Sequence, residues 1–404
     1  MSVKDLETDI HRENDFYNPN VLINIGPHHP AMHGTLRVMC RINGEQIEDA
    51  TCELGYLHRG IEKLGEDKTY HQWMVYTDRL NYCSALNNNI AYAMAVENIM
   101  GIVPTQRCQY IRVICMELSR IIDHIVCLAA NVMDVGGLTV FFLFIHWREQ
   151  AYTMIESMCG MRLTTTYARI GGMSYDLPDN FTERLWKFCD ELPAALDEIE
   201  GLVNSNRIFI DRCKNIGVIN KETALDYGAT GVCLRAAGVD HDLRRDRPYY
   251  MYPELDFDVV IGENGDIYDR YLCRMEEMRQ SIKILKQLNK KIPNGPLWTD
   301  DKRVQIPEKM DVYTKMEVLI HHFKIFMEGI DVPKGEAFTA VEGPNGEVGF
   351  YIVSRGGPKA WRMRVKSPSF MNFQVFEKTV RGGKISDAVA HIGSVNIIAG
   401  ELDR

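Results

Sequence analysis

The feature that most constrains the fold is a change in hydrophobic periodicity after Gly55. Before this glycine, apolar and polar residues alternate, which is typical of half-buried strands. After it, apolar residues recur with the period of an amphipathic helix. The predicted strands are 21–25, 35–42 and 45–54, and the predicted helices are 58–64, 68–100, 105–133 and 138–159. The chain is therefore expected to begin with a small antiparallel sheet and to continue as a bundle of long helices.

The second half of the chain returns from helices to short strands. Further helices are predicted at 179–204 with a break at Pro193, at 267–291 and at 312–328, and strands at 337–341, 347–353 and 361–365. The fold class is α+β, with a small N-terminal antiparallel β-sheet, a central multi-helix bundle and a small α/β C-terminal domain. The predicted units are an arm (1–20), a β domain with a histidine loop (21–57), a helical bundle (58–335) with an irregular insertion (207–260), and the C-terminal domain (336–404).

Charge and cysteine usage exclude several classes of protein. The chain has 46 basic and 55 acidic residues, a net charge of −9, which argues against nucleic acid as a partner. Its 11 cysteines never show the close pairing of zinc or iron–sulfur sites, and they are expected to be reduced thiols in the cytoplasm. The charged stretch Met1–Asp15 lacks the apolar region of a signal peptide, and the most apolar run, Leu138–Trp147, is too short to cross a bilayer. A protein of this kind that works at a membrane is expected to be a peripheral subunit.

The segment Gly26–Gly34 concentrates three histidines in nine residues. Its two prolines lack an N–H and favour extended neighbours, so the segment is predicted to be a stiff loop. The histidines are His28, His29 and His33. Imidazoles on a rigid loop can be zinc ligands, acid–base and hydrogen-bonding groups for a ligand, or ordinary loop residues, and composition leaves these alternatives open.

A cationic and aromatic segment lies inside the irregular insertion. Its residues are Arg244, Arg245, Arg247, Tyr249 and Tyr250. Such a composition suits either a solvated surface or a contact with another subunit, and we favour the subunit contact.

Several motifs, taken in order along the chain, resemble one family. They are Gly-Pro-His-His-Pro-Ala-Met-His-Gly at 26–34, Gly-Tyr-Leu-His-Arg-Gly-Ile-Glu-Lys-Leu at 55–64, Asp-Arg-Leu-Asn-Tyr at 78–82, Glu-Leu-Ser-Arg at 117–120, Asp-Val-Gly-Gly at 134–137, Val-Glu-Gly-Pro-Asn-Gly-Glu at 341–347 and Gly-Glu-Leu-Asp-Arg at 400–404. The chain resembles the D-type subunit, the quinone-site subunit, of respiratory complex I, the proton-translocating NADH:quinone oxidoreductase. The resemblance implies the fold of the nickel–iron hydrogenase large subunit, to which this family is related.

The hydrogenase activity itself is the runner-up, and two positions argue against it. Asn81 and Ser84 stand where such hydrogenases have a pair of thiolates, and Ile398–Glu401 replaces their second cysteine pair. Nickel held by four thiolates therefore has no ligands here. A purely structural subunit remains a further alternative.

The resemblance implies a quinone site with named residues. His33 and Tyr82 correspond to the quinone ligands, Asp134 to the carboxylate that pairs with this histidine, and His29 to a second histidine of the site. His28 is left as loop structure. Arg59 matches an arginine near the terminal 4Fe-4S cluster, which a neighbouring B-type subunit holds.

The resemblance also implies partners and a location. The partners are the B-type, C-type and I-type subunits and the membrane H-type subunit, with FMN, NADH and the clusters bound by other subunits and no metal bound by this chain. The location is the cytoplasmic side of the bacterial inner membrane, where the subunit would be peripheral.

Three departures from the family pattern affect this interpretation. Thr164 replaces a histidine that many ubiquinone-using relatives have, so we expect a cluster potential that is lower and less dependent on pH, suited to menaquinone rather than ubiquinone. Asn396 stands where an aspartate is usual, and His146-Trp147 replaces a commonly acidic pair. These two changes alter the expected local charge.

Overall fold

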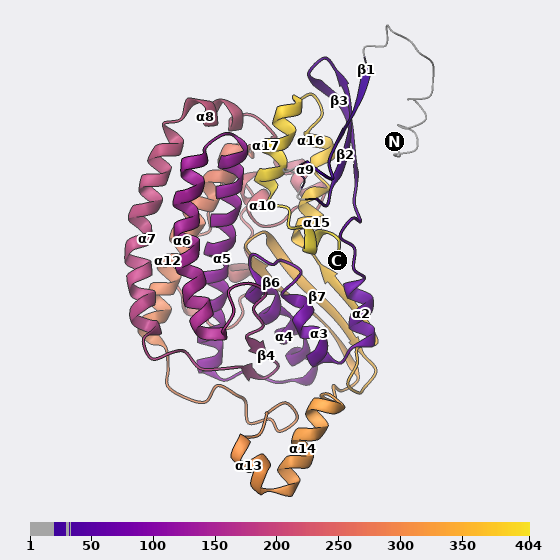
Figure 1. The fold of residues 1–404 in the computed structure, drawn as a ribbon, viewed down its shortest axis with the longest axis vertical. Helices are drawn as coiled ribbons and strands as arrows, with labels where there is room; N and C mark the ends of the chain where they lie inside the picture. Colours follow the sequence, from indigo (N-terminus) through magenta and orange to yellow (C-terminus); the bar gives the residue numbers. More distant parts are fainter. Residues whose placement is uncertain (1–19, 30–31, 33) are drawn as a thin grey trace.

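Two three-stranded antiparallel sheets lie beside a bundle of long helices in residues 20–29, 32 and 34–404, which the computed structural model describes (Figure 1). The first sheet contains β1 (Asn20–Ile25), β2 (Arg37–Asn43) and β3 (Gln46–Glu53), and the second contains β6 (Gly335–Gly343), β7 (Gly346–Ser354) and β8 (Arg362–Lys366). A short pair, β4 (Ala168–Arg169) and β5 (Gly172–Met173), follows the first long helices. The predicted α+β class is confirmed.

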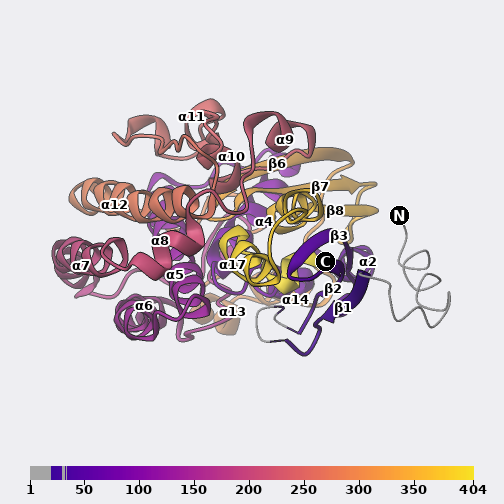
Figure 2. The same ribbon diagram turned by 90° about the horizontal axis from the view of Figure 1, so that it is seen from above.

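The bundle is organised around α5. Its long helices are α4 (Ala85–Met100), α5 (Gln106–Asp134), α6 (Leu138–Cys159), α7 (Phe181–Asn204) and α12 (Ile267–Lys291). Figures 1 and 2 show α5 packed against α6 and α12, with α7 on the outside of the bundle. Since α5 is covered by neighbours over most of its length, most of its side chains are buried, whereas its C-terminal residue, Asp134, is exposed.

The predicted helix 68–100 is wrong because it is interrupted. The chain forms α2 (Ile61–Asp67) and α3 (Tyr70–Thr77), and the turn Asp78–Ser84 then separates α3 from α4. The side-chain oxygen of Asn81 accepts the backbone N–H groups of Cys83 and Ser84, both at 3.1 Å. The Asn81 side chain thus binds N–H groups that a continuous helix would pair with backbone carbonyl groups, and the helix is interrupted there.

Two further helix predictions need correction. α7 continues through Pro193 without a break, since burial of its apolar face outweighs the one hydrogen bond that proline removes. The helix predicted at 312–328 is a hairpin of α13 (Lys309–Thr314) and α14 (Met316–Met327). The prediction for 267–291 agrees with α12 at both ends.

Short helices and loops make up the rest of the described chain. The short helices are α8 (Arg207–Cys213), α9 (Lys221–Asp226), α10 (Val232–Ala236), α11 (Leu243–Asp246), η2 (Tyr252–Glu254), α15 (Pro368–Phe373), α16 (Phe376–Thr379), α17 (Ile385–Val395) and α18 (Ala399–Leu402). Those between α8 and η2 occupy the insertion that is predicted to be irregular.

Both sheets pack on helices that come from distant parts of the sequence. Phe350 of β7 makes edge contacts with Trp73 and Tyr92, at centroid distances of 6.1 and 5.8 Å, so the second sheet covers α3 and α4. The first sheet shares an apolar core with the C-terminal helices, to which Val38 and Ile392 belong. The division into domains predicted above remains a prediction.

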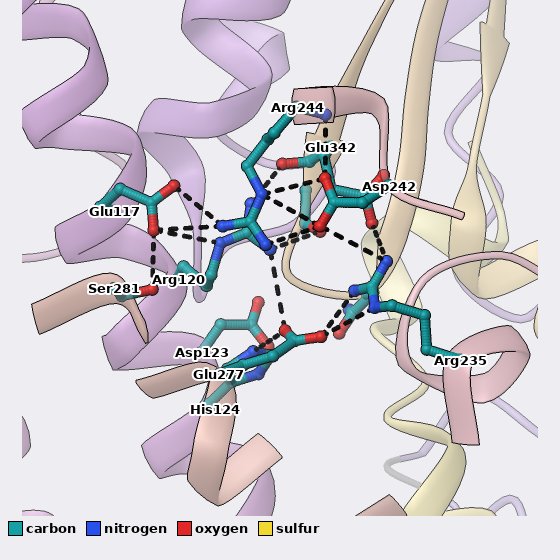
Figure 3. A network of polar contacts seen from close by, with 12 residues as sticks. Glu117, Arg120, Asp123, His124, Arg235, Asp242, Arg244, Glu277, Ser281 and Glu342 are labelled. Atoms are coloured by element: carbon teal, nitrogen blue, oxygen red, sulfur yellow. Dashed lines mark hydrogen bonds and ion pairs between the residues drawn. The ribbon is translucent and has the colours of Figure 1, made fainter. Parts of the chain in front are cut away.

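A buried ionic cluster joins α5, α12, the second sheet and the insertion (Figure 3). We define it as Glu117, Arg120, His124, Arg235, Asp242, Arg244, Glu277 and Glu342, whose side chains are all at most 2% exposed. Arg235 lies between Glu277 Oε1 at 2.6 Å and Glu342 Oε1 at 2.7 Å, and Arg244 Nη2 lies 2.7 Å from Asp242 Oδ2. The prediction that Arg244 forms a subunit contact is therefore wrong, because its charge is matched inside the protein.

The ionic cluster contains four carboxyl groups and three guanidinium groups, and the buried Arg274 lies near enough to act on His124. Burial lowers the pKa of His124 and raises the pKa of Glu342. Burial alone would also raise the pKa of Glu277, but Arg235 holds it well below its usual range. Burial thus opposes the charged forms of both His124 and Glu342, whereas the Arg235 cation stabilises the charged form of Glu277.

Candidate functional site

Tyr82 lies at the turn between α3 and α4, the turn that Asn81 holds in place. Its side chain is 39% exposed. The partial burial of the phenol, with smaller contributions from Cys83 and Asp123, raises the pKa of Tyr82 to about 12. The phenol is therefore protonated at neutral pH and can donate its O–H to a ligand.

The C-terminal segment packs directly against this turn. A Cβ on Gly400 would lie 2.8 Å from the carbonyl oxygen of Leu80, so only glycine allows the two backbones to approach this closely. Arg59 fastens the same junction, because its Nη2 donates to the carbonyl oxygens of Arg79 at 2.8 Å and of Gly400 at 3.3 Å. Burial and the charge of Arg79 lower the pKa of Arg59. Two cations therefore lie beside the turn.

The histidine loop begins and ends in the first sheet. His29 is exposed, and its carbonyl oxygen accepts the N–H of Met32 at 2.9 Å. Met32 and Leu36 are buried in the core that the first sheet shares with the C-terminal helices. His33 lies outside the described residues, so its predicted role is untested. The loop is nevertheless attached to the same C-terminal region that packs on the Tyr82 turn.

Asp134 ends α5 where α17 crosses it. A Cβ on Gly393 would lie 3.3 Å from Asp134 Oδ2 and 3.1 Å from Asn131 Nδ2, and Asn131 donates to the carbonyl oxygen of Ala390 at 3.2 Å. The C-terminal region thus contacts Asp134 as well as the Tyr82 turn. Both Asp134 and His29 have interaction partners.

The segment that contains Thr164 reaches the start of the Tyr82 turn through Asp78. Thr166 Oγ1 donates a hydrogen bond to Asp78 Oδ2, and Asp78 is buried. Burial raises the pKa of Asp78 to about 7, although the hydrogen bond from Thr166 opposes this shift. Thr164 itself has a positive φ of 50°. The sequence motif at 78–82 contains Asp78, but nothing in the motif indicates that this carboxyl is buried and titrates near neutral pH.

Glu401 is a second carboxyl that the sequence did not single out for the site. It is 1% exposed, and its Oε1 accepts the N–H of Ser369 at 2.9 Å. Burial raises the pKa of Glu401 to about 7, and the charge of Asp123 adds to this shift. Asp123 also influences Tyr82, so both groups lie near one buried carboxylate.

Asn81 and Glu401, which occupy positions where the sequence comparison with hydrogenases predicts thiolates, form hydrogen bonds within the protein. Asn81 bonds to the backbone of its own turn, and Glu401 bonds to the N-terminal end of α15. In residues 20–29, 32 and 34–404, no group of three or more His, Cys, Asp or Glu side chains is placed to hold a metal ion. Over the same part of the chain, every helix is too short or too polar to cross a membrane.

Comparison with known proteins places the chain in a family. The model of the family described as "Respiratory-chain NADH dehydrogenase, 49 Kd subunit" matches residues 134–404. The D-type subunit of the NADH-quinone oxidoreductase of Methylacidiphilum infernorum is 48% identical over 384 residues, 95% of this chain and 92% of the relative. The corresponding D-type protein of Pelobacter propionicus is 45% identical over 388 residues, 96% of each chain.

A third relative combines two subunits in its name. The combined C/D protein of the NADH-quinone oxidoreductase of Bdellovibrio bacteriovorus is 48% identical over 391 residues, which cover 97% of this chain and 69% of the relative. These similarities extend over nearly the whole chain, and they confirm the resemblance that the motifs indicated. The chain belongs to the 49 kDa subunit family of the respiratory-chain NADH dehydrogenase, that is, to the D-type subunits of NADH-quinone oxidoreductase.

Proposed function

We propose that this protein forms most of the quinone site of NADH-quinone oxidoreductase and donates protons to the quinone. The placement of Tyr82 is the observation that supports the proposal best. Its phenol is partly exposed and protonated, and its turn contacts the C-terminal region that also meets Asp134 and the histidine loop. The Tyr82 turn, Asp134 and the histidine loop thus contact the same C-terminal region at different points, which supports the proposal.

The chemistry of quinone reduction fits these groups. A quinone takes up two electrons and two protons, and its two carbonyl oxygens become phenolic O–H groups. Tyr82 supplies an O–H at one end and His33 an imidazole N–H at the other. Asp134 pairs with His33 and favours its protonated form, while His29 is a second donor in the loop.

The electrons come from a 4Fe-4S cluster held by the B-type subunit, next to Arg59 and Thr164. FMN and NADH bind to other subunits, and the C-type, I-type and membrane H-type subunits are the further neighbours. The complex is proton-translocating, and this protein lies peripherally on the cytoplasmic side of the bacterial inner membrane.

Tyr82→Phe and His33→Ala should each lower quinone reduction by the assembled complex about 100-fold, since each removes a proton donor from the reacting oxygens. The measurement is NADH-dependent quinone reduction, with the amount of assembled complex determined in parallel. Tyr175→Phe is the matched control, because Tyr175 is exposed on the surface and should leave the rate unchanged. Parental rates in both site variants would leave a purely structural role for this protein.

The pH dependence of the cluster potential tests the preference for menaquinone. With threonine at position 164, the midpoint potential of the terminal cluster should change little with pH, and Thr164→His should introduce a slope approaching the Nernstian limit for one proton per electron. A redox titration of the assembled complex at several pH values measures this slope. Asp78→Asn is the necessary control, because Asp78 faces Thr166 and has a pKa of about 7. A steep slope in both the parent and this control would contradict the prediction.

A further inference from the structure

Asp123 makes the contacts that fix the Tyr82 turn from inside the bundle. It is 1% exposed on α5, and its Oδ2 accepts the Nδ2–H of Asn81 at 2.9 Å. Its Oδ1 accepts the Nδ2–H of Asn396 at 2.7 Å. Asn396 follows α17 in the left-handed conformation, with φ 58° and ψ 65°, which asparagine adopts more readily than most residues. One carboxylate therefore links the Tyr82 turn to the end of α17.

The direction of these hydrogen bonds is set by the carboxylate. Both carboxyl oxygens of Asp123 accept hydrogen bonds, and both asparagines present their NH2 groups to it. For Asn81 this leaves the carbonyl oxygen facing the N–H groups of Cys83 and Ser84, as observed. The orientation of the Asn81 amide, and with it the turn that bears Tyr82, is thus fixed by the hydrogen bond to Asp123.

We propose that Asp123 is a positioning residue for quinone reduction, which holds Tyr82 in the geometry for proton donation by fixing the amide of Asn81. This inference rests on the proposed role of Tyr82. Asp123 is one residue before His124 on α5, at the edge of the ionic cluster (Figure 3). The contacts that define its role are the two amides rather than the charges of that cluster.

The substitution Asp123→Asn separates positioning from packing, because it keeps the size of the side chain. An asparagine at 123 offers one donor and one acceptor, so it cannot accept from both neighbouring amides at once. Either Asn81 turns its NH2 group toward the N–H groups of the turn or the bond to Asn396 is lost. The double variant Asn81→Asp, Asp123→Asn removes this conflict. In it, the new carboxylate accepts both the turn N–H groups and the NH2 of residue 123, while the oxygen of residue 123 accepts from Asn396.

The experiment measures kcat and KM for quinone reduction by the assembled complex. Asp123→Asn should lower kcat about tenfold with KM changed less than about twofold, because a displaced donor slows the chemical step. The double variant should recover kcat to within about twofold of the parent. Asp226→Asn, at an exposed position on α9, is the matched control.

The outcomes distinguish the two proposals. Parental kcat in Asp123→Asn, or no recovery in an assembled double variant, overturns the positioning role even when Tyr82→Phe is inactive. Full activity of Tyr82→Phe overturns the proposed function itself. If the Asp123 carboxylate only stabilised the fold from its original position, moving it to position 81 would not restore kcat. Recovery of kcat in the double variant therefore supports the positioning role.

Discussion

Arg235→Met should lower the free energy of unfolding by about 3–5 kcal/mol. The guanidinium group of Arg235 donates to Glu277 Oε1 at 2.6 and 3.0 Å and to Glu342 Oε1 at 2.7 Å. Methionine fills much of the same space but leaves both carboxyl groups buried without their cation. A buried charge that loses its partner retains the full cost of its desolvation.

Denaturant unfolding of the purified protein measures this effect. Arg207→Met is the matched control, since its side chain is 91% exposed and its pair with Asp211 should contribute less than about 1 kcal/mol. Adding Glu342→Gln to Arg235→Met should restore part of the loss, because one of the two unpaired carboxyl groups is then neutral. A loss below about 1 kcal/mol for Arg235→Met would show that water or a rearranged Arg120 replaces the missing cation.

Glu401→Gln should remove a pH dependence of stability worth about 3 kcal/mol. The pKa of Glu401 is about 7 in the folded protein, against a usual value of 4.5. Between these two values the folded state holds a proton that the unfolded chain has released, so stability falls as the pH rises from about 4.5 to 7. Glutamine cannot ionise, and the variant should therefore gain stability relative to the parent across this range.

Unfolding free energies at several values between about pH 4.5 and 8 test this prediction. The difference between Glu401→Gln and the parent should grow with pH and become constant above about pH 7.5. The exposed Glu198→Gln is the control and should give a difference that does not vary in this way. A difference for Glu401→Gln that stays constant with pH would mean that its carboxyl is already ionised at about pH 5. Asp78 makes a contribution of the same sign, which remains in both proteins.

The fold can be predicted from the sequence wherever local pattern and packing agree. α12 has a continuous helical pattern, an aspartate cap at Asp266 and lysines in its last turn, and its predicted bounds are confirmed. The break at 78–84 could not be predicted, because the amide that causes it is fixed by Asp123, 42 residues further along the chain. At Pro193 the sequence predicts a break that does not occur, because burial of the apolar face of α7 outweighs the local preference of proline.

For the candidate site, too, the sequence predicts residues within motifs but not contacts between distant parts of the chain. Tyr82, Asp134 and Arg59 follow from motifs that resemble a family, and the turn that bears Tyr82, Asp134 and Arg59 each lie against the C-terminal region. The pairing of Asp123 with Asn396 could not be recognised, because 273 residues separate them. The polar neighbours of Arg244 in sequence favour a place at the surface, whereas its ion pairs are with residues that only the folded chain brings near.

The ionic cluster has an evolutionary consequence. Each of its guanidinium groups contacts more than one member of the cluster, so a single substitution leaves at least one charge unmatched in the interior. Most one-step changes there should be strongly deleterious, while paired changes that exchange or remove opposite charges together are tolerated. The cluster is therefore expected to change in descent as a set of coupled positions, through rare double replacements rather than by gradual drift.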